Sequence, residues 1–297
     1  MNPNETALGE PLLRSLLFAP ANRPDLVLKF PRAAADCSVI DLEDGTALAE
    51  KQAARADLRN LVEQVRAAGL SGPLGVRVNA PDSPFFAEDV AAAVTCAPDV
   101  ILLPKAEAVE DVLRLAAAIQ AGGREIAVFA GIETAAGVLH APQICACTRV
   151  LQAVFFGAED LAADIGAQRT DRGDEVLAAR SMVLLAARAS RILAIDQAVV
   201  DIRDDERFLR DCAASRNLGY DGKTCLTPRQ TALANQAFSP SAKELDYAQR
   251  LVAAYEAARA RGLGAFDFEG RMIDTPLLRR AERLLRTQST LGRSSPA

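Results

Sequence analysis

The 297-residue chain contains no tryptophan and a single histidine, His140. A metal centre built from several histidines is therefore excluded, and a Ser-His-Asp or Cys-His triad requires His140 itself. His140 lies in a stretch rich in Ala, Val and Leu, which is typical of a packed or interface histidine, and we assign it no catalytic role. Acid-base chemistry in this protein is expected to depend on carboxylates.

The chain also has no paired cysteine motif, no long apolar run and no dense basic block. Its six cysteines are scattered and lie mostly among small apolar residues, which predicts reduced, packed thiols. No apolar run reaches the roughly 18 residues of a membrane span, and the first ten residues are polar. With a net charge of -5, these features predict a cytoplasmic protein that binds neither membranes nor nucleic acid.

Eight short apolar runs are present, most of them followed by a helical stretch such as 109–121, 174–191 or 204–218. Runs that are apolar throughout are typical of parallel strands covered on both faces. No GxGxxG or GxxxxGK[ST] motif supports a doubly wound sheet. The sequence predicts an α/β protein with a (β/α)8 TIM barrel over residues 1–232. The predicted strands are 15–20, 38–44, 74–79, 100–105, 126–133, 153–160, 194–201 and 222–228.

Residues 233–297 exceed what a barrel needs. They contain two more helical patterns, 242–261 and 276–286, joined by a segment of glycines, aromatics and acids. We expect this part to form a C-terminal helical lid or an oligomerisation segment.

Barrel enzymes place their chemistry where the strands end, because the loops there converge on one mouth. Asp41 and Glu43 are two residues apart on a predicted strand and should share a face, with Arg77 beside them. So many buried acids need a cation, and oxygen ligands without histidine suit Mg²⁺. Any single acid could instead cap a helix or pair with an arginine. The strand-end candidates are Asn22, Asp41, Glu43, Asp44, Arg77, Asn79, Lys105, Glu133, Glu159, Asp160, Asp201, Lys223 and Thr227.

An ordered set of motifs covers residues 14 to about 285. It resembles the citrate lyase beta-subunit-like enzymes of the aldolase/citrate lyase superfamily. The motifs are RSLLFAPANRPD, IDLEDGTALAEKQAAR, VRVN, LPKAE, GIETAAGV, FFGAEDLAADIG, GYDGK and GAFDFEGRMIDTP.

The resemblance implies a Mg²⁺-dependent carbon-carbon lyase acting on a short β-hydroxyacyl-CoA, such as malyl-CoA or citramalyl-CoA, or on a citryl thioester. Glu133 and Asp160 would be the metal ligands. Arg77 would bind the substrate carboxylate or carbonyl oxygen, and Asp41 and Glu43 would line the substrate site with Glu133.

The same resemblance implies that Asp274 is the catalytic acid/base and acts in the site of a neighbouring subunit, within a homotrimer or hexamer. Lys29, Arg14 and Lys223 would contact the coenzyme A part of the substrate. The partners are therefore expected to be an acyl-CoA and a keto acid.

Two departures from the family pattern stand near the site. Thr227 replaces a frequent histidine, and Ala21 a frequent glycine. Three alternatives remain open: a malyl-CoA thioesterase or malate synthase, a pyruvate aldolase without CoA, and a non-catalytic subunit that binds CoA or an acyl carrier. The aldolase is disfavoured because it normally uses a histidine at the mouth.

Overall fold

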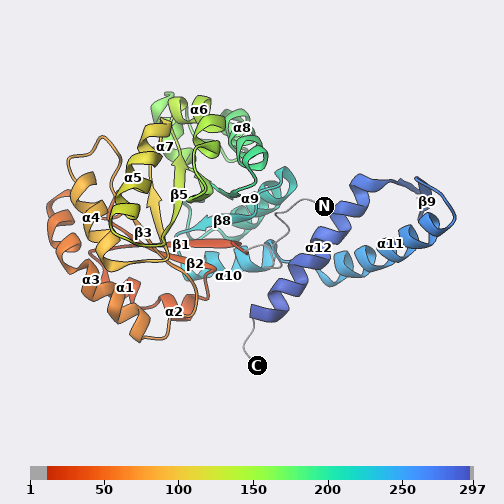
Figure 1. Ribbon diagram of the computed structural model, residues 1–297, viewed down its shortest axis with the longest axis horizontal. Coiled ribbons are helices and arrows are strands. Elements are labelled where there is room, and N and C mark those ends of the chain that lie inside the picture. Colours follow the sequence, from red (N-terminus) through yellow and green to blue (C-terminus); the bar gives the residue numbers. More distant parts are fainter. Residues whose placement is uncertain (1–11, 295–297) are drawn as a thin grey trace. The chain divides into compact units, whose positions relative to one another are not determined.

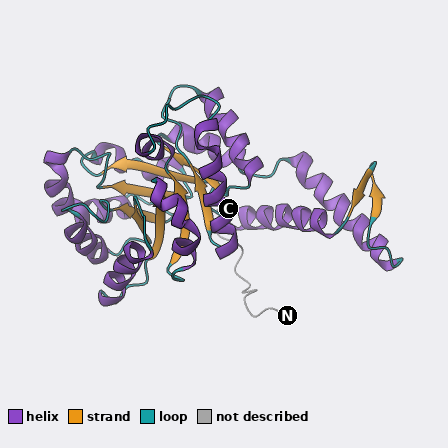
Figure 2. Ribbon diagram, turned by 90° about the horizontal axis from the view of Figure 1, so that it is seen from above, coloured by secondary structure: helices purple, strands orange, loops and turns teal. Residues whose placement is uncertain are grey.

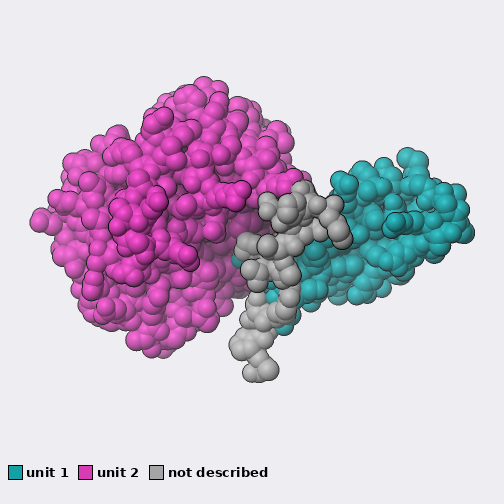
Figure 3. Space-filling view, viewed as in Figure 1, with its two compact units in different colours: residues 1–12, 239–297 teal, residues 13–238 magenta. Residues whose placement is uncertain are grey.

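The computed structural model describes residues 12–294. The chain divides into two compact units after Phe238 (Figure 3). The domain boundary was predicted between residues 232 and 233, which lies inside helix α10 (Pro228–Ala237). In the structure the barrel unit continues to Phe238 and includes the whole of this helix.

Eight parallel strands close into a barrel in sequence order, as predicted. Each begins within two residues of its predicted start. Seven of the eight strands end one to five residues earlier than predicted. The sixth is the clearest case, because Glu159 and Asp160 lie in helix α7 (Ala158–Asp164) and not on the strand. The strands are β1 (Ser15–Pro20), β2 (Cys37–Asp41), β3 (Leu74–Arg77), β4 (Val100–Leu103), β5 (Ala127–Ile132), β6 (Leu151–Phe156), β7 (Leu193–Asp196) and β8 (Gly222–Cys225).

Helices surround this barrel (Figures 1 and 2). The predicted helix 109–121 is found without change, and 174–191 and 204–218 each differ from the structure by one residue. Of the helices in residues 12–294, none is long and apolar enough to cross a membrane. The remaining helices are α1 (Pro24–Val27), α2 (Phe30–Ala33), η1 (Leu48–Glu50), α3 (Lys51–Ala67), α4 (Phe86–Cys96), α5 (Val109–Ala121), α6 (Ala135–Ala146), α8 (Asp174–Ser190) and α9 (Asp205–Leu218).

Alternation along the strands separates two apolar cores. Val39, Leu102 and Phe129 belong to a core made almost entirely of strand residues, which fills the barrel interior. Their strand neighbours pack against the helices in a second, larger core. Two residues beyond Val39 stands Asp41, so the same inward face of β2 becomes charged at the carboxyl end of the barrel.

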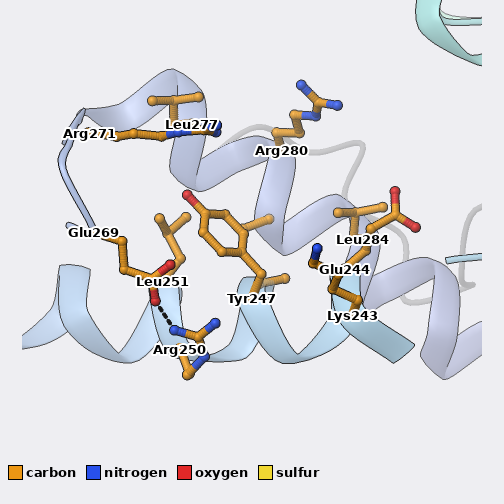
Figure 4. A pocket seen from close by; sticks show the side chains of 12 residues that line it. Lys243, Glu244, Tyr247, Arg250, Leu251, Glu269, Arg271, Leu277, Arg280 and Leu284 are labelled. Atoms are coloured by element: carbon orange, nitrogen blue, oxygen red, sulfur yellow. Dashed lines mark hydrogen bonds and ion pairs between the residues drawn. The ribbon is translucent and has the colours of Figure 1, made fainter. Parts of the chain in front are cut away.

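The C-terminal unit consists of α11 (Ala242–Ala260), a hairpin of β9 (Phe266–Phe268) and β10 (Arg271–Ile273), and α12 (Thr275–Ser294). Both predicted helices are therefore confirmed, and the second ends eight residues later than expected. At the hairpin turn Glu269 and Gly270 both have positive φ, 53° and 76°, as a two-residue type I′ turn requires. Arg250 pairs with Glu269 and ties the hairpin to α11 (Figure 4).

A pocket in this unit lies between α11, the hairpin and α12, with the ring of Tyr247 pointing into it (Figure 4). Its walls combine leucines with basic and acidic side chains. Asp274 does not line it. We therefore assign the pocket no part in the predicted chemistry.

Candidate active site

Asp41 and Arg77 stand side by side at the ends of β2 and β3, where they are register partners. Arg77 donates to both Asp41 oxygens at 2.7 Å. The amides of Glu43 and Gly45 donate to the same two oxygens, each at 2.9 Å. Burial raises the pKa of Asp41, but Arg77 outweighs it and the pKa falls below its usual value. Each oxygen of Asp41 thus accepts two hydrogen bonds, and Asp41 positions Arg77; its contact with substrate stays a prediction.

Arg77 makes a second ion pair, with Nη1 2.8 Å from Oε2 of Glu43. Its guanidinium carbon lies 5.0 Å from the centre of the Phe18 ring, a cation-π contact that sequence reasoning missed. Burial lowers the pKa of Arg77, but Asp41 and Glu43 together raise it above its usual value. A substrate oxygen that reaches Arg77 must therefore compete with Glu43.

A buried lysine fixes the loop that carries Glu43. Lys51 donates to the carbonyls of Leu42 at 2.9 Å and Glu43 at 2.7 Å, and to Oδ1 of Asn79 at 2.6 Å. Asn79 was predicted as a strand-end residue, whereas Lys51 was not recognised. Its only sequence signal is its place in the EKQAAR part of a family motif. These contacts set the backbone direction at the end of β2.

Glu133 and Asp160, the predicted metal ligands, meet around Lys105. Glu133 follows β5 directly, is 2% exposed, and accepts a hydrogen bond from the Lys105 amide at 2.8 Å. Asp160, in the first turn of α7, lies 3.3 Å from Nζ of Lys105. Burial, with added repulsion from Glu43 and Asp160, raises the pKa of Glu133 to about 8. The two carboxylates therefore interact electrostatically.

This donor set fits Mg²⁺. Within residues 12–294 no group of three or more His, Cys, Asp or Glu side chains could hold a metal ion. A site with two carboxylates and positions left for water or substrate is the usual arrangement for Mg²⁺. Burial, followed by repulsion from Glu43 and Asp160, raises the pKa of Glu133, and a bound divalent cation would favour its charged form.

Gly157 makes room for Glu133 between β6 and α7. A Cβ at this position would lie 2.1 Å from Oε2 of Glu133 and 2.5 Å from its Cβ. We predict that Gly157→Ala displaces the Glu133 carboxylate and weakens Mn²⁺ binding at least tenfold, measured by electron paramagnetic resonance. Gly166→Ala, at a positive φ with open space around it, is the control for general strain and should leave Mn²⁺ affinity within about twofold. Equal metal affinity in Gly157→Ala would contradict the prediction.

The three residues predicted to bind CoA lie in different surroundings. Arg14 precedes β1, at the amino end of the barrel, and pairs with Asp36 at 2.7 Å. Lys223 is fully buried and forms ion pairs with Asp211 and, at 3.6 Å, with Asp196, so the structure does not support its predicted contact with CoA. Lys29 is exposed, and its role stays a prediction.

His140, Thr227 and Asp274 lie in three different parts of the structure. His140 is exposed on α6, and its Nδ1 lies 2.8 Å from the carbonyl oxygen of Glu107. Thr227 caps α10 by accepting a hydrogen bond from the Gln230 amide at 3.1 Å, so it has a structural task. Asp274 lies between β10 and α12, in the C-terminal unit.

Fold and site together define the class of protein: a (β/α)8 barrel enzyme with several carboxylates gathered at its mouth. The sequence pattern of the HpcH/HpaI aldolase/citrate lyase family matches residues 14–228. The chain belongs to this family, which confirms the resemblance found in the sequence.

Several relatives are similar over nearly the whole chain. The citrate lyase subunit beta-like protein of Deinococcus radiodurans is 44% identical over 277 residues, covering 92% of this chain and 96% of that protein. The mitochondrial citramalyl-CoA lyase of Homo sapiens is 33% identical, covering 91% and 83%. The crystal structure of CitE from Mycobacterium tuberculosis with magnesium, acetoacetate and coenzyme A is 35% identical, with a TM-score of 0.77, and covers 95% of this chain and 98% of that one.

Proposed function

We propose that this protein is a Mg²⁺-dependent lyase that breaks or forms a carbon-carbon bond in a short β-hydroxyacyl-CoA thioester. The observation that carries the proposal is the geometry at the barrel mouth, where the buried Glu133 accepts a hydrogen bond from the Lys105 amide at 2.8 Å and Asp160 lies 3.3 Å from Nζ of the same lysine. The solved relative with magnesium, acetoacetate and coenzyme A supports the same reading. Citramalyl-CoA lyase, at 33% identity, supports a CoA thioester as substrate.

Glu133 and Asp160 would hold the metal, which when bound polarises the oxygens of the hydroxyacid. Arg77, kept in place by Asp41, would stabilise negative charge on a substrate oxygen. In cleavage the hydroxyl proton would pass to solvent water, the bond to the thioester α-carbon would break to leave a keto group, and its electron pair would remain on the thioester as an enolate. Asp274 would return a proton to that carbon, giving acetyl-CoA and a keto acid.

The assay that tests the proposal uses purified protein with acetyl- and propionyl-CoA, each with glyoxylate, pyruvate or oxaloacetate, and identifies products by mass. Turnover that requires Mg²⁺ and stops with EDTA is expected. Activity unaffected by EDTA would overturn the metal-dependent mechanism. Release of free CoA would instead favour the thioesterase or malate synthase alternative. CoA binding without turnover until partner proteins are added would favour a non-catalytic subunit.

Asp274 is proposed to act in the site of a neighbouring copy within a homotrimer or hexamer. We predict that Asp274→Asn lowers kcat by about a hundred- to ten-thousandfold while Mg²⁺ affinity stays unchanged. Wild-type turnover in Asp274→Asn would eliminate the proton transfer.

Mixing two inactive variants tests the donation between copies. Asp274→Asn and Glu133→Gln should regain activity when unfolded and refolded together, because some mixed sites receive an intact residue from each chain. Size-exclusion chromatography with light scattering would measure the assembly. A fully active monomer would overturn this part of the proposal.

A further inference from the structure

Lys105 has an unusual backbone for a lysine. It follows β4 and has a left-handed φ of 48°, a conformation that is uncommon for residues other than glycine and that is often retained at functional sites. The backbone directs the Lys105 amide to Oε1 of Glu133 at 2.8 Å. The side chain meanwhile reaches β2, where Nζ donates to Oε1 of Glu43 at 2.7 Å. Lys105 thus donates hydrogen bonds to two buried carboxylates, to Glu133 through its backbone amide and to Glu43 through its ammonium group.

The same ammonium lies close to two further carboxylates. Nζ is 3.3 Å from Oδ2 of Asp44 and 3.3 Å from Oδ1 of Asp160. The Lys105 side chain is 30% exposed, so its ammonium can change partners without unfolding the mouth. Asp160 is a proposed metal ligand, and a carboxylate that pairs with an internal cation has less negative charge to offer a metal.

Lys105 also affects the net charge of the mouth. With every group charged, as a bound metal would require of Glu133, the five carboxylates and two cations of the mouth give a net charge of 2 - 5 = -3, which a divalent ion brings to -1. Without Lys105 these values become -4 and -2. An anionic keto acid would then meet a more negative site even when the metal is bound. The groups counted are Asp41, Glu43, Asp44, Glu133 and Asp160 with Arg77 and Lys105.

We propose that Lys105 sets the charge of the mouth in two opposing ways: it competes with the metal for Asp160, and it favours entry of the anionic substrate. The inference rests on the proposed function, because it takes Glu133 and Asp160 as the metal ligands. When the metal arrives, Lys105 leaves Asp160 and keeps its hydrogen bond to Glu43. Replacing a merely structural lysine would weaken the binding of both the metal and the keto acid. Replacing a lysine with the proposed role strengthens metal binding and weakens keto-acid binding.

The test replaces Lys105 in the full-length protein by methionine, with Lys105→Gln as a second neutral variant and Lys105→Arg as the matched charged control. Mn²⁺ binding without substrate is measured by electron paramagnetic resonance, and Mg²⁺ binding by calorimetry. The neutral variants should bind metal roughly three- to tenfold more tightly, as expected for loss of one partly exposed ion pair. Lys105→Arg should keep the wild-type metal affinity.

At saturating metal the neutral variants should raise the KM of the keto acid about tenfold or more. Metal affinity that is unchanged or weaker in both neutral variants would overturn this inference and leave the proposed function standing. An unchanged KM would overturn the part of the inference that concerns entry of the anionic substrate. Wild-type protein that binds no Mn²⁺ would instead overturn the proposed function itself.

Discussion

Replacing Glu133 by glutamine is expected to lower turnover at least about a thousandfold and to abolish detectable Mn²⁺ binding. Glutamine keeps the shape of the side chain but removes the charge that the metal needs, and a metal supplies several kcal/mol of transition-state stabilisation. The carboxylate is buried beside Asp160, so no exposed acid can replace it. Glu110→Gln, in the exposed first turn of α5, is the control and should bind metal and turn over as the wild type does.

Glu133→Gln lowers turnover but should raise the free energy of unfolding of the metal-free protein. The pKa of Glu133 is raised from 4.5 to about 8 because burial and two neighbouring acids disfavour its charge. Between these pH values the folded, metal-free protein keeps a proton that the unfolded chain has lost, so its free energy of unfolding falls as pH rises. The stabilising contribution of the proton on Glu133 is lost completely above about pH 8.

Metal-free Glu133→Gln should therefore be more stable than metal-free wild type at pH 9, and the difference should shrink toward pH 5. Urea unfolding in EDTA at both pH values measures it. A variant that is destabilised equally at both values would show that Glu133 is not held under electrostatic strain.

Replacing Arg77 by methionine is expected to lower the free energy of unfolding by about 3–5 kcal/mol, because it leaves buried carboxylates without their cation. Asp41 and Glu43 are 2% and 3% exposed, and both pair with Arg77. Turnover should also fall by about a hundred- to thousandfold through loss of a charge stabiliser. Chemical denaturation and steady-state kinetics measure the two effects.

A double variant separates the pair from the single residue. Asp41→Asn combined with Arg77→Met should cost less than the sum of the two single variants, because both charges of the Asp41–Arg77 pair are removed together and only Glu43 loses a partner. Strict additivity would mean that the pair contributes no coupling energy. Arg77→Lys keeps the charge but loses the two-pronged geometry, so it should recover part of the stability and little of the turnover.

Much of the site was predictable because it depends on chain-local patterns. Asp41 and Arg77 end neighbouring parallel strands, and parallel strands bring their carboxyl ends to one mouth. The alternation of side chains also predicted that Asp41 and Glu43 would turn to the same region, and both pair with Arg77. Asp160 was recognised as a candidate although its strand assignment was wrong, because the motif around it carried the signal.

Other features needed the third dimension. Lys223 ends a family motif and follows the expected register, yet its side chain is fully buried among Asp196 and Asp211. Nothing local distinguishes a strand lysine that faces a ligand from one that faces a covering helix. Arg14 likewise pairs with Asp36 at the end of the barrel away from the mouth.

The sequence by itself determined the barrel, the order of its strands and the acids at their ends, because hydrophobic periodicity and motif order are local properties of a chain. Only the tertiary structure decided how those acids are neutralised. Lys105 reaches Glu43 across 62 residues of sequence, and Lys51 reaches Asn79 across 28. Ion pairs between distant residues depend on the closing of the barrel and on one left-handed backbone, at Lys105, which no periodicity encodes.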